Sequence, residues 1–467
     1  MPALPLAQQL IADRRFFHSL AEPGWLEFRT SLEIAARLVD LGWSVQLGKA
    51  LHTENRLALP SRDFKAHYEA KCGIKRAELA QLFGRVQQGA SAPIARTTNH
   101  ATQMPIDDRV FAEILDSYTG VVADWDSGQP GPYVLFRFDI DALAIGESQA
   151  KDHRPAREHF AQSNGQACHA CAHDGHIALG LALAQIIAQT TSLKGKVRLV
   201  FQPAEESCRG AYSMVKKGLA AGVDYMFACH LGLGIPSSSL GLATQGFLAS
   251  QKFLLDVQGQ AAHAASAPET GKNALLAAAS LALNLHTLTQ YGHSKAFLNV
   301  GRLEAGQVPN VIPESAQMEF EIRAIDAKTM QDLESKMKTL VQGICQARDL
   351  SYQLTPEGYA EALDPAYLSA YVDQGRKLHQ TVAALGLQPI LAPDFAASED
   401  VVTWMNQVLR QGGQALHLML GTDTSTAHHH PAFDFREEDL LPNLQVLCAS
   451  VEALTGLALQ AYPKDRR

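Results

Sequence analysis

The sequence predicts an α/β protein with a mainly parallel sheet, into which a second and smaller α+β domain is inserted. Strand and helix patterns alternate from Tyr133 to Cys229, which is typical of a parallel sheet covered by helices. A different order of elements follows Gly246, and the first texture returns near Ala360. At 467 residues the chain is also too long for one ordinary core, so two or three domains are expected.

The alternating part consists of short apolar runs separated by helical patterns. The expected strands are YVLFRFD, KVRLVFQ and VDYMFAC, and the expected helices between them are HIALGLALAQIIAQ and GAYSMVKKG. Polar residues follow these strands at the point where each strand ends. Because open α/β sheets place their sites at the carboxyl ends of strands, we expect the functional site at this edge.

The segment after Gly246 predicts the order β-α-β-β-α-β. Its parts are KFLLDVQGQ, NALLAAASLALNLHTL, KAFLNVGRL, AQMEFEIRAI, KTMQDLESKMKTLVQGICQARD and SYQLTPEGY. This order is typical of a ferredoxin-like sandwich. We therefore expect the first part of a catalytic domain at residues 1–245, an inserted domain at 246–358, and the second part of the catalytic domain at 359–467. Residues 50–117 form a poorly periodic insert whose role the sequence does not reveal.

Charge and hydropathy exclude two classes of partner. The chain carries 40 basic and 48 acidic residues, a net charge of -8, and has no long Lys/Arg run, so no nucleic acid partner is expected. No window reaches the ~18 unbroken apolar residues of a membrane helix, and the N-terminal MPALPLAQQLIADRRFF lacks a signal-peptide pattern. We therefore expect a cytoplasmic protein with no membrane contact. Its seven cysteines, an odd number in a large chain, are expected to be reduced.

Side chains that bind metals or transfer protons gather near the expected strand ends. They are Asp139 with Asp141, Cys171 with His173, Glu205 with Glu206, His230, and His429 in AHHHPAFDF. A catalytic metal site needs donors from separate elements and a general base beside a water molecule. Adjacent glutamates at one strand end can divide this work, because one can bind metal while its neighbour takes a proton.

Each of these groups also has a simpler interpretation. Cys168 and Cys171 form a C-x-x-C pair as in redox proteins, but the surrounding histidines and the missing tryptophan or proline argue against that function. The glutamate pair alone is typical of a solvated turn, and three adjacent histidines are typical of a surface loop. Their occurrence together at successive strand ends favours a single metal site over independent coincidences.

Seven motifs carry a resemblance to a known family. RFDIDALAI, HACAHDGH, FQPAEE, HLGLG, GQAAHAASAPETGKNALLAA, PNVIP and HHHPAFDF, in this order and spacing, resemble the dimetal amidohydrolases and peptidases related to aminoacylase, hippurate hydrolase and the indoleacetyl-amino-acid hydrolases. The resemblance covers nearly the whole chain. AEPGWLEFRTS and LGKALHTENRLALP resemble in particular the A subunits of p-aminobenzoyl-glutamate hydrolases. The resemblance implies a zinc-peptidase-like catalytic domain with an inserted lid and dimerisation domain.

The resemblance also implies a role for each donor. Two divalent metal ions, manganese or zinc, would be bound by Cys171, His173, Glu206, His230 and His429. Cys171 would be the bridging thiolate, and His430 is the alternative to His429. Glu205 would be the general base that activates water and passes the proton to the leaving amine, with Asp139 and Asp141 in support. Cys, His and Glu donors suit either metal.

Further residues are implied in the inserted domain. His263 would reach the active site of a partner protomer and polarise the scissile carbonyl, and Asn310 and Arg323 would hold the substrate carboxylate. The alternative for Arg323 is an exposed pair across the sheet. The expected partner is a second copy of the chain bound through the inserted domain, or a related B subunit in a hetero-oligomer.

The implied reaction is metal-dependent hydrolysis of the amide bond of an N-acyl or N-aroyl amino acid, with p-aminobenzoyl-glutamate as the named small-molecule substrate. The alternatives are a broader N-acyl-amino-acid amidohydrolase or dipeptidase, and a dependent subunit of a hetero-oligomeric hydrolase. Three positions depart from the family pattern. Ala172 replaces a glycine that would permit a positive φ between two ligands, Cys168 replaces a methionine, and Pro309 replaces an arginine of the p-aminobenzoyl-glutamate hydrolases.

Overall fold

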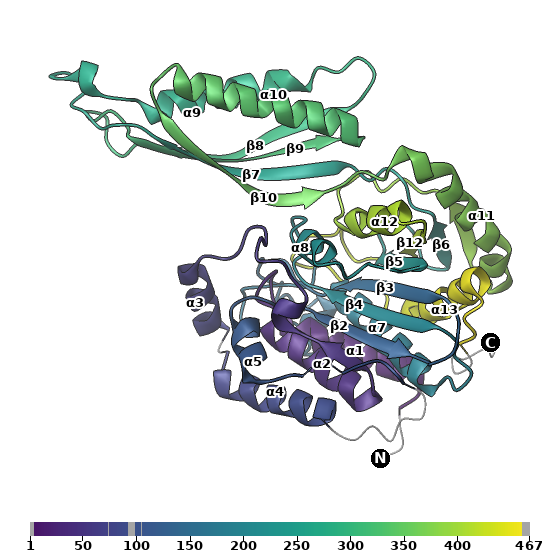
Figure 1. Ribbon diagram of the computed structural model, residues 1–467. Helices are drawn as coiled ribbons and strands as arrows, with labels where there is room; N and C mark the ends of the chain where they lie inside the picture. The colour runs from purple at the N-terminus through teal and green to yellow at the C-terminus, as the bar shows by residue number, and fades with distance from the viewer. Residues whose placement is uncertain (1–3, 73, 92–98, 104, 460–467) are drawn as a thin grey trace.

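The chain folds into two units, each built around its own β-sheet (Figure 1). The computed structural model describes residues 4–72, 74–91, 99–103 and 105–459. An eight-stranded sheet has the order β1-β2-β4-β3-β5-β12-β6-β11, and a separate four-stranded sheet has the order β10-β7-β9-β8. The predicted fold class, a mainly parallel sheet accompanied by an inserted α+β domain, is confirmed.

The central strands of the large sheet run parallel to one another. β3 (Tyr133–Asp139) pairs with β4 (Lys196–Gln202) and β5 (Tyr225–Leu231), and β5 also pairs with β12 (Gln414–Leu420). The outer strands are β1 (Ser44–Gln46), β2 (Val121–Asp126), β6 (Ser239–Leu242) and β11 (Gln388–Leu391). Antiparallel pairings join β1 to β2, β2 to β4, and β6 to β12. The central strands are apolar runs because helices cover both of their faces.

Helices form a layer on each face of this sheet (Figure 1). One layer contains α1 (Leu6–Leu20), α2 (Phe28–Leu41), α7 (His173–Gln189) and α13 (Leu440–Thr455), which contact one another. The other contains α8 (Gly210–Lys216) and α12 (Val401–Arg410), and α11 (Leu368–Ala384) packs beside β6 and β11. α7 is apolar on nearly every side because it is buried between its neighbours.

Among the described residues, six helical segments span only three or four residues each. They are α6 (Arg154–Arg157) and the 3-10 turns η1 (Gly48–Ala50), η2 (Pro268–Thr270), η3 (His286–Thr289), η4 (Pro365–Tyr367) and η5 (Glu437–Asp439).

The inserted unit has the expected order of elements. It runs through β7 (Ala249–Gln258), α9 (Ala274–Leu285), β8 (Ala296–Ala305), β9 (Ser315–Ala324), α10 (Ala327–Gln346) and β10 (Ser351–Ala360). α10 buries Met330, Leu333, Met337, Val341 and Cys345, which follow the three-to-four-residue spacing of one helix face. The sheet therefore has one face covered by α9 and α10, and its other face is turned toward the catalytic unit (Figure 1).

The poorly periodic insert at residues 50–117 contains three helices. They are α3 (Arg62–Lys71), α4 (Arg76–Ser91) and α5 (Asp108–Leu115), while residues 73, 92–98 and 104 of this region lie outside the described part. α4 packs against α2 and buries Leu79, Leu82, Phe83 and Val86. That spacing is helical, but the polar residues around it and the Gly/Pro-rich flanks conceal it in the sequence.

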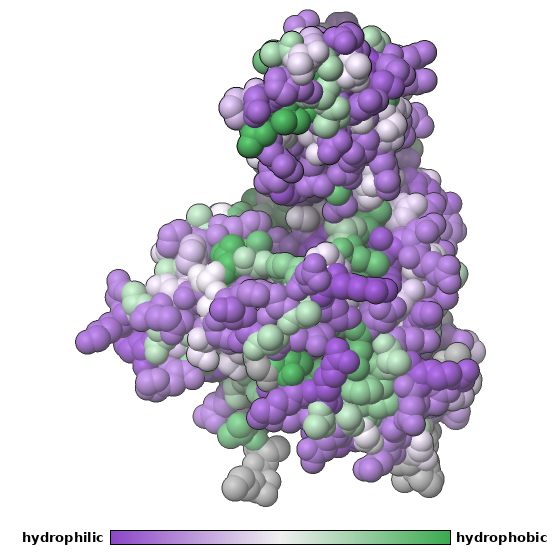
Figure 2. Space-filling model, turned by 90° about the vertical axis from the view of Figure 1, so that its left-hand side faces the viewer, coloured by the Kyte–Doolittle hydropathy of each residue, from purple (hydrophilic) through white to green (hydrophobic). Residues whose placement is uncertain are grey.

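The molecule is hollowed between its two lobes (Figure 2). The inserted unit forms the upper lobe, whose visible surface is mostly hydrophilic, and hydrophobic residues gather along the lower edge of the hollow. In the part of the chain that the structure describes, no helix is long and apolar enough to cross a membrane.

Candidate metal centre

The predicted donors meet at the carboxyl edge of the large sheet. Asp139 is the last residue of β3, His230 lies near the end of β5, and the loop after β4 carries Glu205 and Glu206. His173 begins α7, two residues after Cys171. Because β3, β4, β5 and β12 are parallel, all these strands end at the same edge, and the loop after β12 brings His429 to it.

The donor atoms lie close enough to share metal ions. Cys171 Sγ is 3.5 Å from His230 Nε2, His429 Nε2 is 3.6 Å from a Glu206 oxygen, and His173 Nε2 is 3.9 Å from a Glu205 oxygen. Three sets of donors each lie within 4.8 Å of one another: Cys171, His173 and His230; Cys171, Glu206 and His429; and His173, Glu205 and Glu206. Cys171, His173 and Glu206 each occur in two of these sets, so these three residues link the sets into one cluster.

Hydrogen bonds orient the histidine rings toward this cluster. Nδ1 of His173 donates to the carbonyl of Asp141 at 2.8 Å, and Nδ1 of His230 donates to the carbonyl of Leu231 at 2.9 Å. Each ring therefore directs its Nε2 toward the donor cluster, and this is the nitrogen through which the ring would bind a metal. His173 Nε2 and Glu206 Oε1 are buried without a hydrogen-bond partner among the described residues, so both atoms fit a metal ligand.

The acidic groups show the same need for positive charge. Burial, together with the neighbouring Glu399 and Glu206 charges, raises the pKa of Glu205 well above its ordinary value. Burial raises the pKa of Glu206 to about 7, and burial with the Glu206 charge raises the pKa of the Cys171 thiol to about 12. Divalent cations reverse such shifts because they favour ionised ligands. The crowding of these groups thus fits a site built to hold cations.

His176 lies next to the cluster but is already fully engaged. Its Nδ1 donates to Asp139, and its Nε2 accepts a hydrogen bond from the backbone of Leu231 at 2.9 Å. Neither ring nitrogen is available to an ion, so His176 holds its neighbours in position. The sequence offers HACAHDGH without showing which of its histidines is free, and the structure distinguishes them.

The two supporting aspartates have separate tasks. The carboxylate of Asp141 accepts hydrogen bonds from the backbone nitrogens of Glu205 and Glu206, both at 3.0 Å, which fixes the glutamate loop. Asp139 lies 2.5 Å from the buried guanidinium of Arg137, which also contacts Asp400 at 2.7 Å. Burial alone would raise the pKa of Asp139, but the neighbouring His173, His176 and Arg137 side chains hold it well below its ordinary value. Asp139 therefore remains a carboxylate beside the rings.

Left-handed backbone occurs beside several of the predicted ligands. Ala172, between Cys171 and His173, has φ +65°, and His429 has φ +67°. In the glutamate loop Ala204, Ser207 and Cys208 have φ +52°, +71° and +61°. Residues other than glycine adopt this conformation at a cost, and such strain is concentrated at functional sites. Ala172 thus keeps the conformation that the glycine of the family pattern would allow.

The choice between His429 and His430 depends on their directions. A cavity lies over the donor cluster and is called the metal-centre cavity below. The ring of His429 lines it, and the backbone nitrogen of His429 donates to the carbonyl of Ala170 at 2.8 Å. His430 accepts from the backbone nitrogen of Ala432 through Nδ1 and does not line that cavity. His428 lines the cavity and contacts the backbone of Leu231 at 3.2 Å.

The metal-centre cavity, of about 470 Å³, opens directly over the cluster and reaches the inserted unit. Arg323 on β9, proposed from the sequence as a substrate-binding residue, lines this cavity. Its guanidinium also forms a two-bond pair with Glu321, both bonds at 3.0 Å. Lys252, Phe395 and Ser398 line the same cavity and did not stand out in the sequence. Nothing in the periodicity of β7 or of the loop after β11 distinguishes them from ordinary strand and loop residues.

The other two predicted residues of the inserted domain lie elsewhere. His263 and Asn310 are exposed, and neither lines the metal-centre cavity. The loops that carry them are joined by hydrogen bonds, such as that from the Ala264 nitrogen to the Asn310 carbonyl at 3.1 Å. These loops follow β7 and precede β9, at the end of the sheet that points away from the catalytic unit (Figure 1). Within one chain they do not meet the donors.

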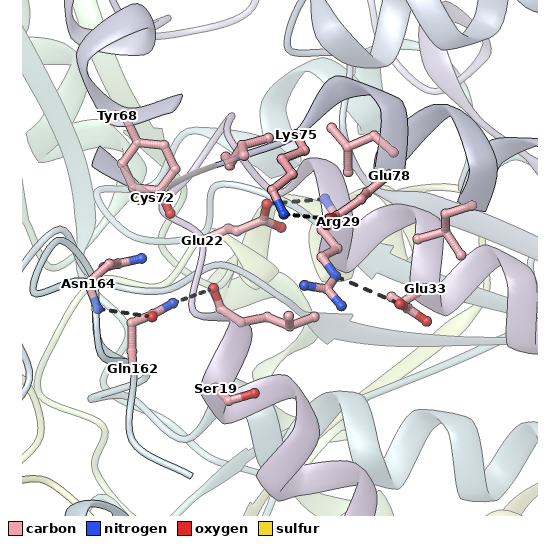
Figure 3. A pocket seen from close by; sticks show the side chains of 14 residues that line it. Ser19, Glu22, Arg29, Glu33, Tyr68, Cys72, Lys75, Glu78, Gln162 and Asn164 are labelled. Atoms are coloured by element: carbon pink, nitrogen blue, oxygen red, sulfur yellow. Dashed lines mark hydrogen bonds and ion pairs between the residues drawn. The ribbon is translucent and has the colours of Figure 1, made fainter. Parts of the chain in front are cut away.

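A second, smaller cavity of about 220 Å³ lies between α1, α2 and the α3–α4 segment (Figure 3). Its charged groups are matched within the fold: Lys75 pairs with Glu78 at 3.0 Å, and Arg29 approaches Glu33 at 3.8 Å. Glu22 accepts hydrogen bonds from the backbone nitrogens of Arg29 and Thr30, and burial raises its pKa to about 7. This cavity contrasts with the donor cluster, where His173 Nε2 and Glu206 Oε1 have no hydrogen-bond partner among the described residues.

Comparisons with known proteins agree with this architecture. A model of the peptidase family M20/M25/M40 matches residues 135–453. The chain is 36% identical over 468 residues to the A subunit of p-aminobenzoyl-glutamate hydrolase from Escherichia coli K12, an alignment covering 99% of this chain and 97% of that protein. It is 35% identical over 449 residues to indole-3-acetyl-aspartic acid hydrolase of Enterobacter agglomerans, covering 95% of this chain and 94% of that protein.

Among solved structures, an aminobenzoyl-glutamate utilization protein from Klebsiella pneumoniae matches with a TM-score of 0.69 at 31% identity. The match covers 97% of each chain. The resemblance inferred from the seven motifs is thereby confirmed, and with it the prediction of an enzyme that hydrolyses amide bonds. The chain belongs to the peptidase family M20/M25/M40.

Proposed function

We propose that this chain hydrolyses the amide bond of p-aminobenzoyl-glutamate, releasing p-aminobenzoate and glutamate. The observation that carries the proposal is the convergence of Cys171, His173, Glu206, His230 and His429 around Glu205 beneath one cavity. Two full-length relatives are named for conjugates of an aromatic acid with an acidic amino acid, p-aminobenzoyl-glutamate and indole-3-acetyl-aspartic acid. These names support an aroyl or arylacetyl group on one side of the amide bond and an acidic amino acid on the other.

The five donors would hold two divalent metal ions, manganese or zinc, with Cys171 as the shared ligand. When bound, the ions supply Lewis acidity that lowers the pKa of a water molecule and polarises the scissile carbonyl. Sulfur, imidazole and carboxylate donors suit either metal. The orphaned His173 Nε2 and Glu206 Oε1 support their assignment as ligands.

Glu205 is the proposed general base. It takes the proton from the attacking water and delivers it to the nitrogen of the leaving amino acid, so that its carboxylate is regenerated in each turnover. Its backbone nitrogen is held by Asp141, and its carboxylate lies 3.9 Å from His173 Nε2.

The inserted domain completes the site in a homodimer. His263 of one copy polarises the scissile carbonyl in the other, and Arg323 and Asn310 bind the substrate carboxylate. Exposed apolar side chains support this surface as an interface: Leu283 is 77% exposed and Leu276 55% exposed on α9, and Phe297 is 49% exposed on β8, the edge strand. A hetero-oligomer with a related B subunit is the alternative, because the Escherichia coli relative is itself named as one of the subunits of a hydrolase.

The test is p-aminobenzoate release by the purified chain with manganese or zinc. Glu205→Gln should lower kcat by about 10³-fold while keeping the bound metal, because a general base contributes roughly 10²- to 10⁴-fold. Glu438→Gln, on the exposed surface, is the matched control and should match the wild type.

Absence of release from a folded, metal-loaded chain would contradict a self-sufficient p-aminobenzoyl-glutamate hydrolase. Adding a related B subunit, and then a panel of other N-acyl amino acids and dipeptides, would separate the dependent chain from the broader amidohydrolase.

A further inference from the structure

The metal-centre cavity contains a cation for which the proposed mechanism has no use. Lys252 lies on β7, half-buried, on the sheet face opposite the one that packs against α9 and α10. Its side chain lines the cavity together with Glu205, Glu206 and His429.

Lys252 is held against the loop that carries the catalytic glutamate. It pairs across the sheet with Gly358 of β10, and a β-carbon at Gly358 would stand 3.1 Å from Cδ of Lys252 and 2.4 Å from the carbonyl oxygen of Ser207. The lysine stem therefore lies across β10 at the point where this strand touches the glutamate loop. Only glycine leaves room for both contacts.

Within the described part of the chain, no carboxylate neutralises this ammonium. Glu321 lies directly opposite Lys252 on β9, yet both of its oxygens are bound by the guanidinium of Arg323. Among the described residues, Lys252 has no side-chain hydrogen bond and no ion pair within 4.0 Å. A half-buried cation without a counter-charge is costly unless a ligand supplies that charge.

The space beside Lys252 can receive such a ligand. A cavity of about 520 Å³ adjoins the metal-centre cavity, and Lys252 and Ser207 line both. Glu319, Glu321 and Glu357 also line this cavity, but none of the ion pairs within 4.0 Å among the described residues joins them to Lys252. Lys252 therefore stands at the junction of the two spaces. Arg323 is two residues from the position opposite Lys252 and points to the same sheet face, a diagonal separation of roughly 7–8 Å. One amino acid with two carboxylates can reach both cations, because both side chains are long.

We propose that Lys252 binds the side-chain carboxylate of the substrate and makes the hydrolase selective for conjugates of acidic amino acids. This inference rests on the proposed function and adds a specificity residue to it. A lysine is a flexible point charge, whereas arginine presents a rigid fork. Lys252 therefore accommodates aspartate and glutamate, whose carboxylates lie at different distances from the amide bond.

The test compares two substrates of nearly equal shape, p-aminobenzoyl-glutamate and p-aminobenzoyl-glutamine. Lys252→Met keeps the stem across β10 and removes the charge. It should lower kcat/KM for the glutamate conjugate by about 10- to 100-fold, as expected for a lost charge-assisted hydrogen bond, and change the glutamine conjugate by less than about 2-fold. Lys377→Met removes an exposed lysine of α11 outside the cavity and should leave both values unchanged.

An equal fall for both conjugates, or no fall for either, would overturn the assignment, because a structural role for the lysine does not distinguish their charges. A wild-type enzyme that hydrolyses both conjugates equally also overturns it and leaves the proposed function intact. A wild type that releases p-aminobenzoate from neither conjugate refutes the proposed function as well.

A measurement on the unaltered chain guards against misfolding of the variant. Free glutamate should inhibit the wild-type enzyme at least about 10-fold more strongly than free glutamine, since only glutamate carries the second carboxylate. Equal inhibition by the two amino acids would contradict the proposal.

Discussion

The donor cluster and the two loops of the inserted domain that carry His263 and Asn310, called the distal loops here, differ in their exposure to solvent. At the cluster, Cys171, His173 and His230 are buried, and hydrogen bonds to backbone carbonyls orient the two histidine rings. At the distal loops, His263 and Asn310 are exposed and outside the metal-centre cavity. The first region is assembled within one chain, whereas the role proposed for the second requires the surface of another chain. Chemistry and oligomerisation can therefore be tested separately.

The largest expected effect lies at the cluster, where His429 and His430 compete for one role. His429→Ala should lower kcat by about 10³-fold, since loss of a metal ion removes several kcal/mol of transition-state stabilisation. Metal analysis should show less bound metal than in the wild type. His430→Ala, one residue away, should keep both metal and activity. Retention of metal and activity in His429→Ala would show that the cluster is closed by another side chain.

The distal loops should give a smaller effect, and one that depends on a partner. His263→Ala should lower kcat by about 10²-fold without changing the metal content, as for the loss of one donor to a developing oxyanion. Mixed with Glu205→Gln, it should regain about a quarter of wild-type activity, because half of randomly formed dimers contain one site with both residues intact. A mixture no more active than its parts would exclude an exchange of His263 between copies.

The catalytic unit and the inserted unit as a whole should also differ in how strongly their stability depends on acid pH. Burial lowers the pKa of His52, His169 and His417 in the catalytic unit to about 3, whereas His286 and His293 of the inserted unit are exposed. Below pH 6.5 these histidines bind protons in the unfolded chain but stay neutral in the folded one. The free energy of unfolding therefore falls as the pH is lowered from 6.5 to about 3.

Substitution of His52 measures how much this one residue contributes to the loss of stability at low pH. Its ring bonds Ser213 and the carbonyl of Thr119, both at 2.8 Å, so His52→Gln destabilises the chain at pH 7.5. That deficit should shrink by roughly 1.4 kcal/mol for each pH unit below 6.5, measured by urea unfolding of the metal-free protein. The exposed His293→Gln is the control and should show no such trend. A deficit in His52→Gln that is constant with pH would mean that the ring is already protonated in the fold.

The smallest effect concerns the backbone at the ligands. Ala172→Gly should raise the free energy of unfolding by about 0.5 kcal/mol, because relief of the left-handed strain slightly exceeds the entropy that glycine adds to the unfolded chain. Ala178→Gly in the middle of α7 should instead lower it by about 1 kcal/mol. Destabilisation by Ala172→Gly would show that its buried methyl group contributes more than the strain costs.

The sequence predicted the parts of the structure that depend on local patterns. Apolar runs marked β3, β4 and β5, and the strand ends marked the donors, because parallel strands end at one edge. The helices of residues 50–117 escaped prediction because their apolar face is narrow and their neighbours are polar. Lys252 escaped it because nothing in the pattern of its strand marks it. The contacts of Arg137 with Glu399 and Asp400 escaped it because partners more than 250 residues apart leave no periodic signal. An arginine inside the apolar strand YVLFRFD was the one clue to those contacts.

The contact of β10 with the glutamate loop limits how this enzyme can be re-engineered. The backbone nitrogen of Tyr359 donates to the carbonyl of Cys208 at 2.7 Å, immediately after a register shift at Pro356 and Gly358. The inserted domain is thus joined to the catalytic loop by its own last strand. A chimera that exchanged this domain between relatives would have to keep a glycine at position 358, because a β-carbon there would stand 2.4 Å from the carbonyl oxygen of Ser207.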